Sequence, residues 1–234
     1  MTPNGAPRDD DDGSRSEHPL RLAHRGDHRH ALENSLAAMR AALALPGCDG
    51  LEFDLQAARD GTPVVIHDET LARTHQRAER TDALSVEELR ALGVPTFADV
   101  LALAPPEAFL DVEVKTDVVA AAAEPLRGWI AGGGRAIVSS FEPGVLASLR
   151  ALLPEVARWL NSEELDEATL ATAVEYGCAA VSVRWDAIDA DRVARARSAG
   201  LDVAGWTIVD RDVLARVERL GVVATCVEGE ALTG

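Results

Sequence analysis

The sequence predicts an α/β fold, a closed (β/α)8 TIM barrel with a short cap segment inserted after a β-hairpin. From Leu20 onward, short apolar runs alternate with helix-like patterns, an alternation typical of a parallel sheet. Gly177, Gly200 and Gly221 each separate a helical pattern from an apolar run, and their intervals of 23 and 21 residues fit one compact helix–strand unit. A chain of 234 residues is long enough for one such barrel.

Nine segments have the composition of strands, whereas a closed barrel needs eight. The turn pair Asp60-Gly61 resolves this difference, because Asp-Gly between two extended runs favours a hairpin. We therefore expect 63–66 to return antiparallel to the end of 49–55 and to leave eight parallel strands. The alternative is an open doubly wound sheet, but no glycine-rich phosphate loop follows the first strand. The candidate strands are 20–23, 49–55, 63–66, 109–114, 136–140, 156–160, 179–183, 202–207 and 222–226.

Helix starts are marked by side chains that can cap a first turn. Asn34 is the expected N-cap of a helix whose apolar stripe includes Met39. Ser85 and Glu88 have the spacing of a capping box, and Thr96 is expected to open the next helix.

Composition and charge limit the classes of partner. The net charge is −16, which disfavours nucleic acid phosphates and anionic lipids. Residues 1–18 contain the acidic run 9–12 and no apolar period, so we expect a disordered acidic tail. Residues 19–234 are expected to form a single barrel domain with its cap over about 68–95. The chain shows no signal-peptide pattern and no membrane-spanning run, which predicts a cytoplasmic protein.

Charged residues recur at alternate positions of two predicted strands. Glu52 and Asp54 share one face of a strand, and Asp111, Glu113 and Lys115 share one face of the next. Charges that face a barrel interior are costly unless they are paired or bind a metal. If Glu52, Asp54 and Glu113 converge, their oxygens suit Mg²⁺ or Ca²⁺. The alternative is that both rows face solvent as ion pairs.

Two histidines and two cations are expected beside these carboxylates. His24 ends the first strand and His67 ends the returning arm of the hairpin, so the pair can act as general acid and general base. Arg25 and Lys115 could hold a phosphoryl group. Lys115 is the one lysine among 23 basic residues, which suggests a place for a compact ammonium. Trp206 either lines the barrel mouth and touches substrate or packs in the core.

Seven segments together resemble the signature of glycerophosphodiester phosphodiesterases, in the same order along the chain. The resemblance implies a TIM barrel that hydrolyses glycerophosphodiesters to glycerol 3-phosphate and an alcohol. It also implies roles for the residues above: His24 and His67 as the acid/base pair, Glu52, Asp54 and Glu113 as ligands of one divalent cation, Arg25 and Lys115 as phosphate contacts. The segments are AHRG (23–26), ENS (33–35), DGLEFDL (49–55), RDGTPVVIHDETLART (59–74), VEVK (112–115), SSFEP (139–143) and GWT (205–207).

The expected partner is a small phosphodiester, attacked by a substrate hydroxyl or by water. Two alternatives stand beside this function: a lysophospholipase D-type activity on an acylated substrate, and a barrel that binds phosphate or metal without catalysis. The last strand ends Ala224-Thr225-Cys226-Val227-Glu228, where the family usually has Thr-Asp and then Pro. Cys226 itself is expected to be a buried small residue, and His28 and His30 are expected at the surface.

Overall fold

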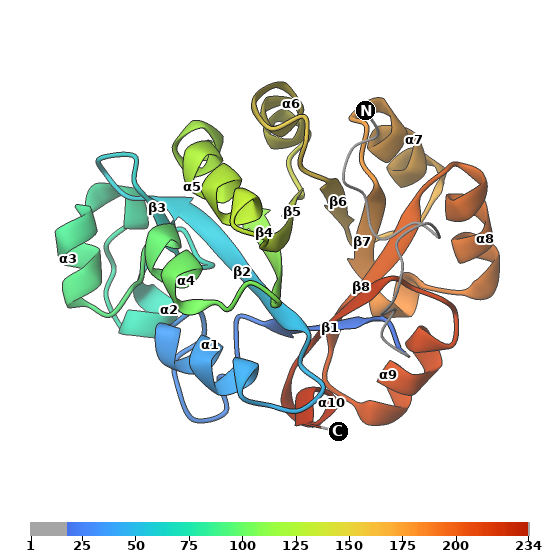
Figure 1. Ribbon diagram of the computed structural model, residues 1–234, viewed down its shortest axis with the longest axis horizontal. Coiled ribbons are helices and arrows are strands. Elements are labelled where there is room, and N and C mark those ends of the chain that lie inside the picture. Colours follow the sequence, from blue (N-terminus) through green and yellow to red (C-terminus); the bar gives the residue numbers. More distant parts are fainter. Residues whose placement is uncertain (1–17, 234) are drawn as a thin grey trace.

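The computed structural model describes residues 18–233, so the expected tail, apart from His18, lies outside the described residues (Figure 1). Strands and helices alternate along the chain as predicted. The strands are β1 (Leu20–His24), β2 (Gly50–Ala57), β3 (Pro63–Val65), β4 (Phe109–Val114), β5 (Arg135–Ser140), β6 (Arg158–Ser162), β7 (Ala180–Arg184), β8 (Asp202–Ile208) and β9 (Ala224–Val227). The α-helices are α1 (Leu36–Leu43), α2 (Ala72–His75), α3 (Val86–Ala91), α4 (Phe97–Leu103), α5 (Val119–Ala131), α6 (Pro143–Leu152), α7 (Glu167–Glu175), α8 (Ala190–Ser198), α9 (Arg211–Glu218) and α10 (Gly229–Thr233).

Eight parallel strands close into a barrel, which confirms the predicted fold. The order runs β1-β9-β8-β7-β6-β5-β4-β2, and pairing between β1 and β2 completes the ring. The helices lie outside the strands, with α5 to α9 forming an arc around them in Figure 1. Within the described residues, no helix has the length and apolar character needed to cross a membrane.

The barrel interior below the strand ends is filled by apolar side chains. Phe109 and Trp159 stack there with ring centroids 6.3 Å apart, and Leu22 and Ile137 pack against the same cluster. Trp159 is 1% exposed, so its truncation to alanine would cost about 3–5 kcal/mol of folding free energy. This packed apolar layer supports the polar side chains at the carboxyl ends of the strands and restricts their movement.

The ninth strand is the predicted hairpin arm. β3 pairs antiparallel with β2, with Leu55 opposite Val65, and Gly61 takes the positive φ of +81° that the turn requires. The outer side of β3 is covered as well: the Val65 N–H donates to the Pro95 carbonyl, and Val64 forms a bridge with Thr96.

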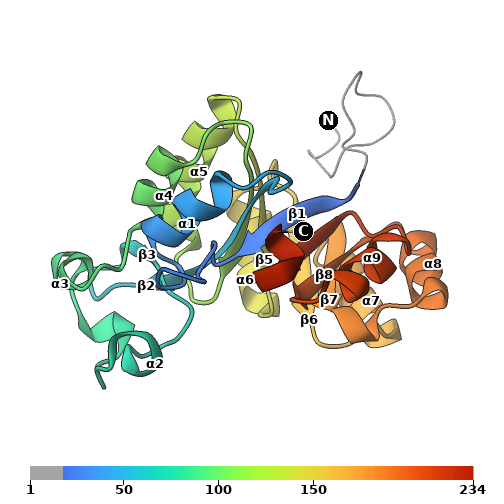
Figure 2. The ribbon, with the colours of Figure 1, turned by 90° about the horizontal axis from the view of Figure 1, so that it is seen from below.

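The expected cap segment, about 68–95, contains α2, a 3₁₀ turn (Thr81–Ala83) and α3. Its apolar residues Leu71, Leu89 and Val94 form a separate small core with Val64 and Ile66 of the hairpin arm. Figure 2 shows α2 and α3 projecting together from one side of the barrel. The capping box of Ser85 and Glu88 is present, as is a second one that Thr96 and Asp99 form at α4.

Among the predicted boundaries that differ from the structure, two bear on the barrel mouth. The N-cap of α1 is Ser35, whose Oγ accepts from the Ala38 N–H, and Asn34 precedes it with a left-handed φ of +57°. The strand expected at 156–160 is β6, Arg158–Ser162, because Val156 closes a turn with Leu153 and the strand continues through polar residues that line the barrel mouth.

Candidate active site

Three carboxylates converge at the carboxyl ends of β2 and β4. Glu52 and Asp54 alternate with apolar neighbours along β2, so both point into the barrel, and the sheet register sets Asp54 opposite Glu113 of β4. One oxygen from each of the three lies within 4.8 Å of the others. Asp54 is fully buried and Glu52 nearly so. The alternative of two solvated outer rows is therefore wrong.

Burial and mutual repulsion make this cluster unfavourable as three free anions. Burial raises the pKa of Glu52, and the charges of Asp54 and Glu113 raise it further. Burial and Asp54 likewise raise the pKa of Glu113. Burial also acts to raise the pKa of Asp54, but Lys115 and Arg25 outweigh it and lower that pKa. A bound cation would offset the same repulsion without protonation.

Both predicted cations lie against the carboxylates. Lys115 Nζ is 2.5 Å from Glu113 Oε1 and 3.2 Å from Asp54 Oδ1. Arg25 Nε is 3.3 Å from Asp54 Oδ2, and its Nη1 donates to Glu33 at 2.9 Å. Each keeps a partly exposed side chain at the cavity, where an anionic group could bind.

The turn after β1 orients Arg25 and Asn34 toward Asp54. Arg25 has a positive φ of +58°, and Gly26 follows with +81°. A Cβ at Gly26 would lie 2.6 Å from the Ala38 carbonyl carbon, so only glycine allows α1 to approach this turn. Asn34 Nδ2 donates to Asp54 Oδ2 at 2.7 Å, which leaves Asp54 Oδ1 for other partners.

The two predicted histidines also meet at the barrel mouth, each with a carboxylate on its Nδ1. His24 Nδ1 hydrogen-bonds to Glu228 Oε1, and its Nε2 is 3.8 Å from Glu52 Oε2. His67 Nδ1 is 2.7 Å from Asp68 Oδ1. Burial lowers the pKa of His67, which favours a neutral ring near neutral pH.

A cavity of about 120 Å³ lies between the charged residues described above and the residues on the opposite side of the barrel mouth. Its lining has two chemically distinct parts. The charged wall comes from β1, β2, β4 and the hairpin arm and consists of His24, Arg25, Glu52, His67, Glu113 and Lys115, with Asp54 behind them. The neutral wall comes from the ends of β5 to β8 and consists of Phe141, Asn161, Ser182, Trp206 and Thr207.

The neutral wall is ordered by its own contacts. Trp206 Nε1 donates to the Ser182 carbonyl at 2.9 Å, and Phe141 meets the indole edge to face with centroids 5.7 Å apart. Trp206 thus lines the mouth rather than the core. Asn161 is 6% exposed, and its Oδ1 has no hydrogen-bond partner. A buried acceptor facing a cavity is suited to a ligand donor.

Two more groups lie deeper between the walls. Asp111 is buried with the pKa raised to about 7, because burial outweighs the hydrogen bond that Ser139 donates at 2.6 Å. Cys226 is a buried free thiol whose pKa burial raises well above its usual range. Cys226 is thus the inert small residue that the sequence predicts.

A chain of ion pairs ties the cap to the charged wall. Arg73 of α2 donates from Nε to Asp68 Oδ2 at 2.7 Å and from Nη1 to Glu33 Oε2 at 2.7 Å. Asp68 contacts His67, and Glu33 contacts Arg25. Arg73 therefore binds the two carboxylates that contact predicted site residues, Asp68 beside His67 and Glu33 beside Arg25.

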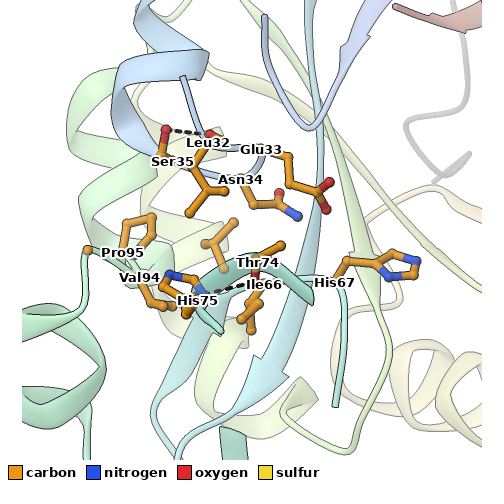
Figure 3. A pocket seen from close by; sticks show the side chains of 12 residues that line it. Leu32, Glu33, Asn34, Ser35, Ile66, His67, Thr74, His75, Val94 and Pro95 are labelled. Atoms are coloured by element: carbon orange, nitrogen blue, oxygen red, sulfur yellow. Dashed lines mark hydrogen bonds between the residues drawn. The ribbon is translucent and has the colours of Figure 1, made fainter. Parts of the chain in front are cut away.

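A second, smaller cavity of about 10 Å³ lies between the cap and the turn before α1. Figure 3 shows Thr74 and His75 facing this space, while the His67 ring points away from it. The cavity has room for about one water molecule. The site chemistry therefore belongs to the larger cavity.

Several site residues were missed by the sequence analysis. Asn34 and Arg73 lie inside the quoted segments ENS and RDGTPVVIHDETLART, but nothing in those letters shows their contacts. Asn161 and Glu228 had no local signal. His28 was expected at the surface, yet it is half-buried with Nε2 3.4 Å from Glu228 Oε1. His30 is exposed as expected.

Comparisons with known proteins agree with this geometry. The family model described as "Glycerophosphoryl diester phosphodiesterase family" matches residues 24–228. A "Probable glycerophosphodiester phosphodiesterase 2" of Mycobacterium tuberculosis is 30% identical over 83% of this chain and 81% of its own length. A glycerophosphodiester phosphodiesterase of Caldanaerobacter subterraneus is 36% identical, over 43% of this chain. That alignment spans 46% of the Caldanaerobacter protein, less than half of its length.

Solved structures share the whole barrel. An Oleispira antarctica phosphodiesterase, solved in complex with the product sn-glycerol-3-phosphate, matches with a TM-score of 0.82 and 26% identity, over 90% of this chain and 93% of that one. A Thermotoga maritima glycerophosphodiester phosphodiesterase matches in fold with a TM-score of 0.78 at 21% identity, over 94% and 97% of the two chains. On the extent of the family match, the chain belongs to the glycerophosphoryl diester phosphodiesterase family.

Proposed function

We propose that this protein hydrolyses glycerophosphodiesters to glycerol 3-phosphate and an alcohol. The observation that carries the proposal is the convergence of the buried Glu52 and Asp54, the half-buried Glu113 and two histidines at one cavity, beside Arg25 and Lys115. Membership of the family supports it, as does the product named for the Oleispira antarctica structure. The substrate class is a small phosphodiester.

Glu52, Asp54 and Glu113 are the proposed ligands of one divalent cation, Mg²⁺ or Ca²⁺. Their donor set is all oxygen, which hard cations prefer. Glu52 Oε1 is buried with no hydrogen-bond partner, and the buried Asp54 Oδ1 has only the ion pair with Lys115, so acceptors are available for an ion. When bound, the cation supplies positive charge that stabilises the phosphoryl oxygens in the transition state.

The remaining residues bind the phosphoryl group and move protons. Arg25 and Lys115 hold the phosphoryl oxygens by charge-assisted hydrogen bonds. One histidine of the pair His24 and His67 removes the proton from the attacking group, a water molecule or a hydroxyl of the substrate, as its oxygen bonds to phosphorus. The other histidine donates a proton to the alcohol oxygen as the bond between that oxygen and phosphorus breaks. Attack by water gives glycerol 3-phosphate directly, whereas attack by a substrate hydroxyl gives a cyclic phosphate that water then opens to glycerol 3-phosphate, with the two histidines in exchanged roles. Trp206 and the rest of the neutral wall contact the organic part of the substrate.

A substrate panel with metal controls tests the proposal. Glycerophosphocholine, glycerophosphoethanolamine, lysophosphatidylcholine and bis(p-nitrophenyl) phosphate are assayed with Mg²⁺, with Ca²⁺ and with EDTA, for the wild type and His24→Ala. We expect metal-dependent turnover of the first two, lost in EDTA and reduced at least ~100-fold by the substitution. Preference for lysophosphatidylcholine would instead indicate a lysophospholipase D-type enzyme. No turnover of any substrate by folded, metal-bound protein would overturn the proposal.

A further inference from the structure

The residue after the last strand reaches the first strand across the closure of the barrel. In the parallel pairing of β1 and β9, Ala23 lies opposite Val227, so the next residues along the two strands, His24 and Glu228, are neighbours at the carboxyl end. Glu228 Oε1 accepts a hydrogen bond from His24 Nδ1, although the two residues are 204 positions apart. The contact therefore depends on barrel closure and on this register.

The chemistry of the contact fixes which ring nitrogen carries hydrogen. Burial acts to raise the pKa of Glu228, but the hydrogen bonds with His24 and His28 lower it, so the carboxylate is ionised near neutral pH. An ionised carboxylate only accepts hydrogen bonds, so His24 Nδ1 must be the donor. The other nitrogen, Nε2, is then left on the side of Glu52 and the cavity.

Glu228 is itself held in place. The same Oε1 is 3.4 Å from His28 Nε2, so the carboxylate lies between two imidazole rings. Its side chain is 24% exposed and does not belong to the carboxylate cluster of Glu52, Asp54 and Glu113. Because Glu228 contacts His28 as well as His24, its rotation is restricted, and so is that of the His24 ring.

The second histidine has a simpler arrangement. His67 is held by Asp68, its immediate neighbour in sequence, and Asp68 is held by Arg73. Both rings are thus oriented by a carboxylate on Nδ1, once from the adjacent residue and once from the opposite end of the chain. Carboxylates in this position set the tautomer and direction of an imidazole.

We propose that Glu228 is the positioning residue of His24: it holds the Nδ1–H tautomer and aims Nε2 into the cavity, with His28 bracing the carboxylate. The catalytic part of this inference rests on the proposed hydrolysis, in which His24 transfers a proton. The structural part concerns the resting protein and needs no substrate.

The test uses Glu228→Ala and Glu228→Gln, with Glu230→Gln as a matched control on the exposed side of α10. Nitrogen-15 NMR of the imidazoles reports the tautomer of each ring, and the His24 signals are identified by their loss in His24→Ala. We expect a hydrogen-bonded Nδ1–H in the wild type, its loss in Glu228→Ala and its partial retention in Glu228→Gln. The kcat should fall ~10–100-fold in Glu228→Ala with little change in KM, and less in Glu228→Gln. Glu230→Gln should match the wild type.

Two results would overturn the proposal. One is a His24 signal in Glu228→Ala that keeps the wild-type tautomer. The other is a rise in KM with unchanged kcat, which would make Glu228 a substrate contact. Circular dichroism checks folding. Should the alanine variant not fold, Glu228→Gln takes its place, and a His24 tautomer and a kcat both unchanged from the wild type in that variant would overturn the proposal. Should the wild type prove inactive on every phosphodiester, the proposed hydrolysis fails, whereas the NMR spectra still decide whether Glu228 holds His24.

Discussion

The charged wall and the neutral wall face the same cavity but satisfy their polar groups differently. In the charged wall, carboxylates and cations are paired with one another, yet the buried Glu52 Oε1 stays without a hydrogen bond. In the neutral wall, Trp206 is fixed by a backbone carbonyl, and Asn161 Oδ1 is the unpartnered atom. The first wall therefore suits a cation and a phosphoryl group, and the second suits an uncharged arm of a substrate.

The largest expected effect comes from breaking the charged wall. Glu52→Gln should reduce kcat/KM on the order of a thousandfold, since a catalytic metal supplies several kcal/mol of charge stabilisation. In EDTA the same substitution should raise the melting temperature by roughly 2–4 °C, because relief of buried repulsion by ~1 kcal/mol has that effect in a domain of this size. Initial rates and differential scanning fluorimetry measure the two quantities.

Glu52→Gln is expected to lower kcat/KM and to raise the melting temperature in EDTA, and this combination distinguishes a cation ligand from a residue needed for folding. Glu87→Gln, on the exposed side of α3, serves as the control and should change neither quantity. A variant that loses stability in EDTA as well as activity would show that Glu52 is needed for folding rather than for cation binding.

A smaller effect on activity is expected from a substitution in the neutral wall. Asn161→Leu should raise the KM for glycerophosphocholine ~5-fold, the equivalent of one hydrogen bond of about 1 kcal/mol. The KM for bis(p-nitrophenyl) phosphate, which has no hydroxyl to donate, should not rise, and the affinity for Mg²⁺ measured by calorimetry should stay unchanged. Equal losses on both substrates, or weaker cation binding, would remove the distinction between the two walls.

The smallest effect is expected on stability, from loss of the ion pairs by which Arg73 connects the cap to the charged wall. Hydrogen bonds from Arg73 lower the pKa of Asp68 to about 2. Burial acts to raise the pKa of Glu33, but Arg73 and Arg25 lower it to about 2. Lowered carboxyl pKa values add stability that is present above the unfolded-state pKa values near 4 and is lost as pH falls toward 2.

Arg73→Gln should therefore cost ~1 kcal/mol at pH 7, a modest value because Arg73 is about half exposed. The difference from the wild type should shrink as the pH falls from 5 to 2.5, as measured by thermal unfolding. Arg77→Gln removes a pair with Glu79 inside the cap and is the control. A penalty that stays constant with pH would show that the Arg73 side chain acts by packing alone.

The sequence predicted site residues best where the residues concerned lie within, or at the end of, a single strand. Alternation of Glu52 and Asp54, and the strand-end positions of His24, His67 and Lys115, depend on local geometry and were predicted with the correct neighbours. The Asp60-Gly61 turn likewise revealed that one of nine strands lies outside the ring.

The missed residues depend on contacts between distant segments. Glu228 meets His24 through the β1–β9 register, which no local pattern specifies. Asn34 resembles a helix cap because asparagine favours that place, but Ser35 competes for it one residue later and frees Asn34 for Asp54. Asn161 extends β6 beyond its apolar run, where hydrophobicity no longer marks the strand.

The position of β3 has a consequence for the protein in concentrated solution. A closed barrel has no free strand edge, but a ninth strand added outside the ring creates one, and exposed edges can recruit other chains into intermolecular sheets. Here the added strand has three residues, and Pro95 and Thr96 occupy its outer hydrogen-bonding positions. The hairpin thus carries His67 to the site and supports the cap while offering other molecules little backbone on which aggregation could begin.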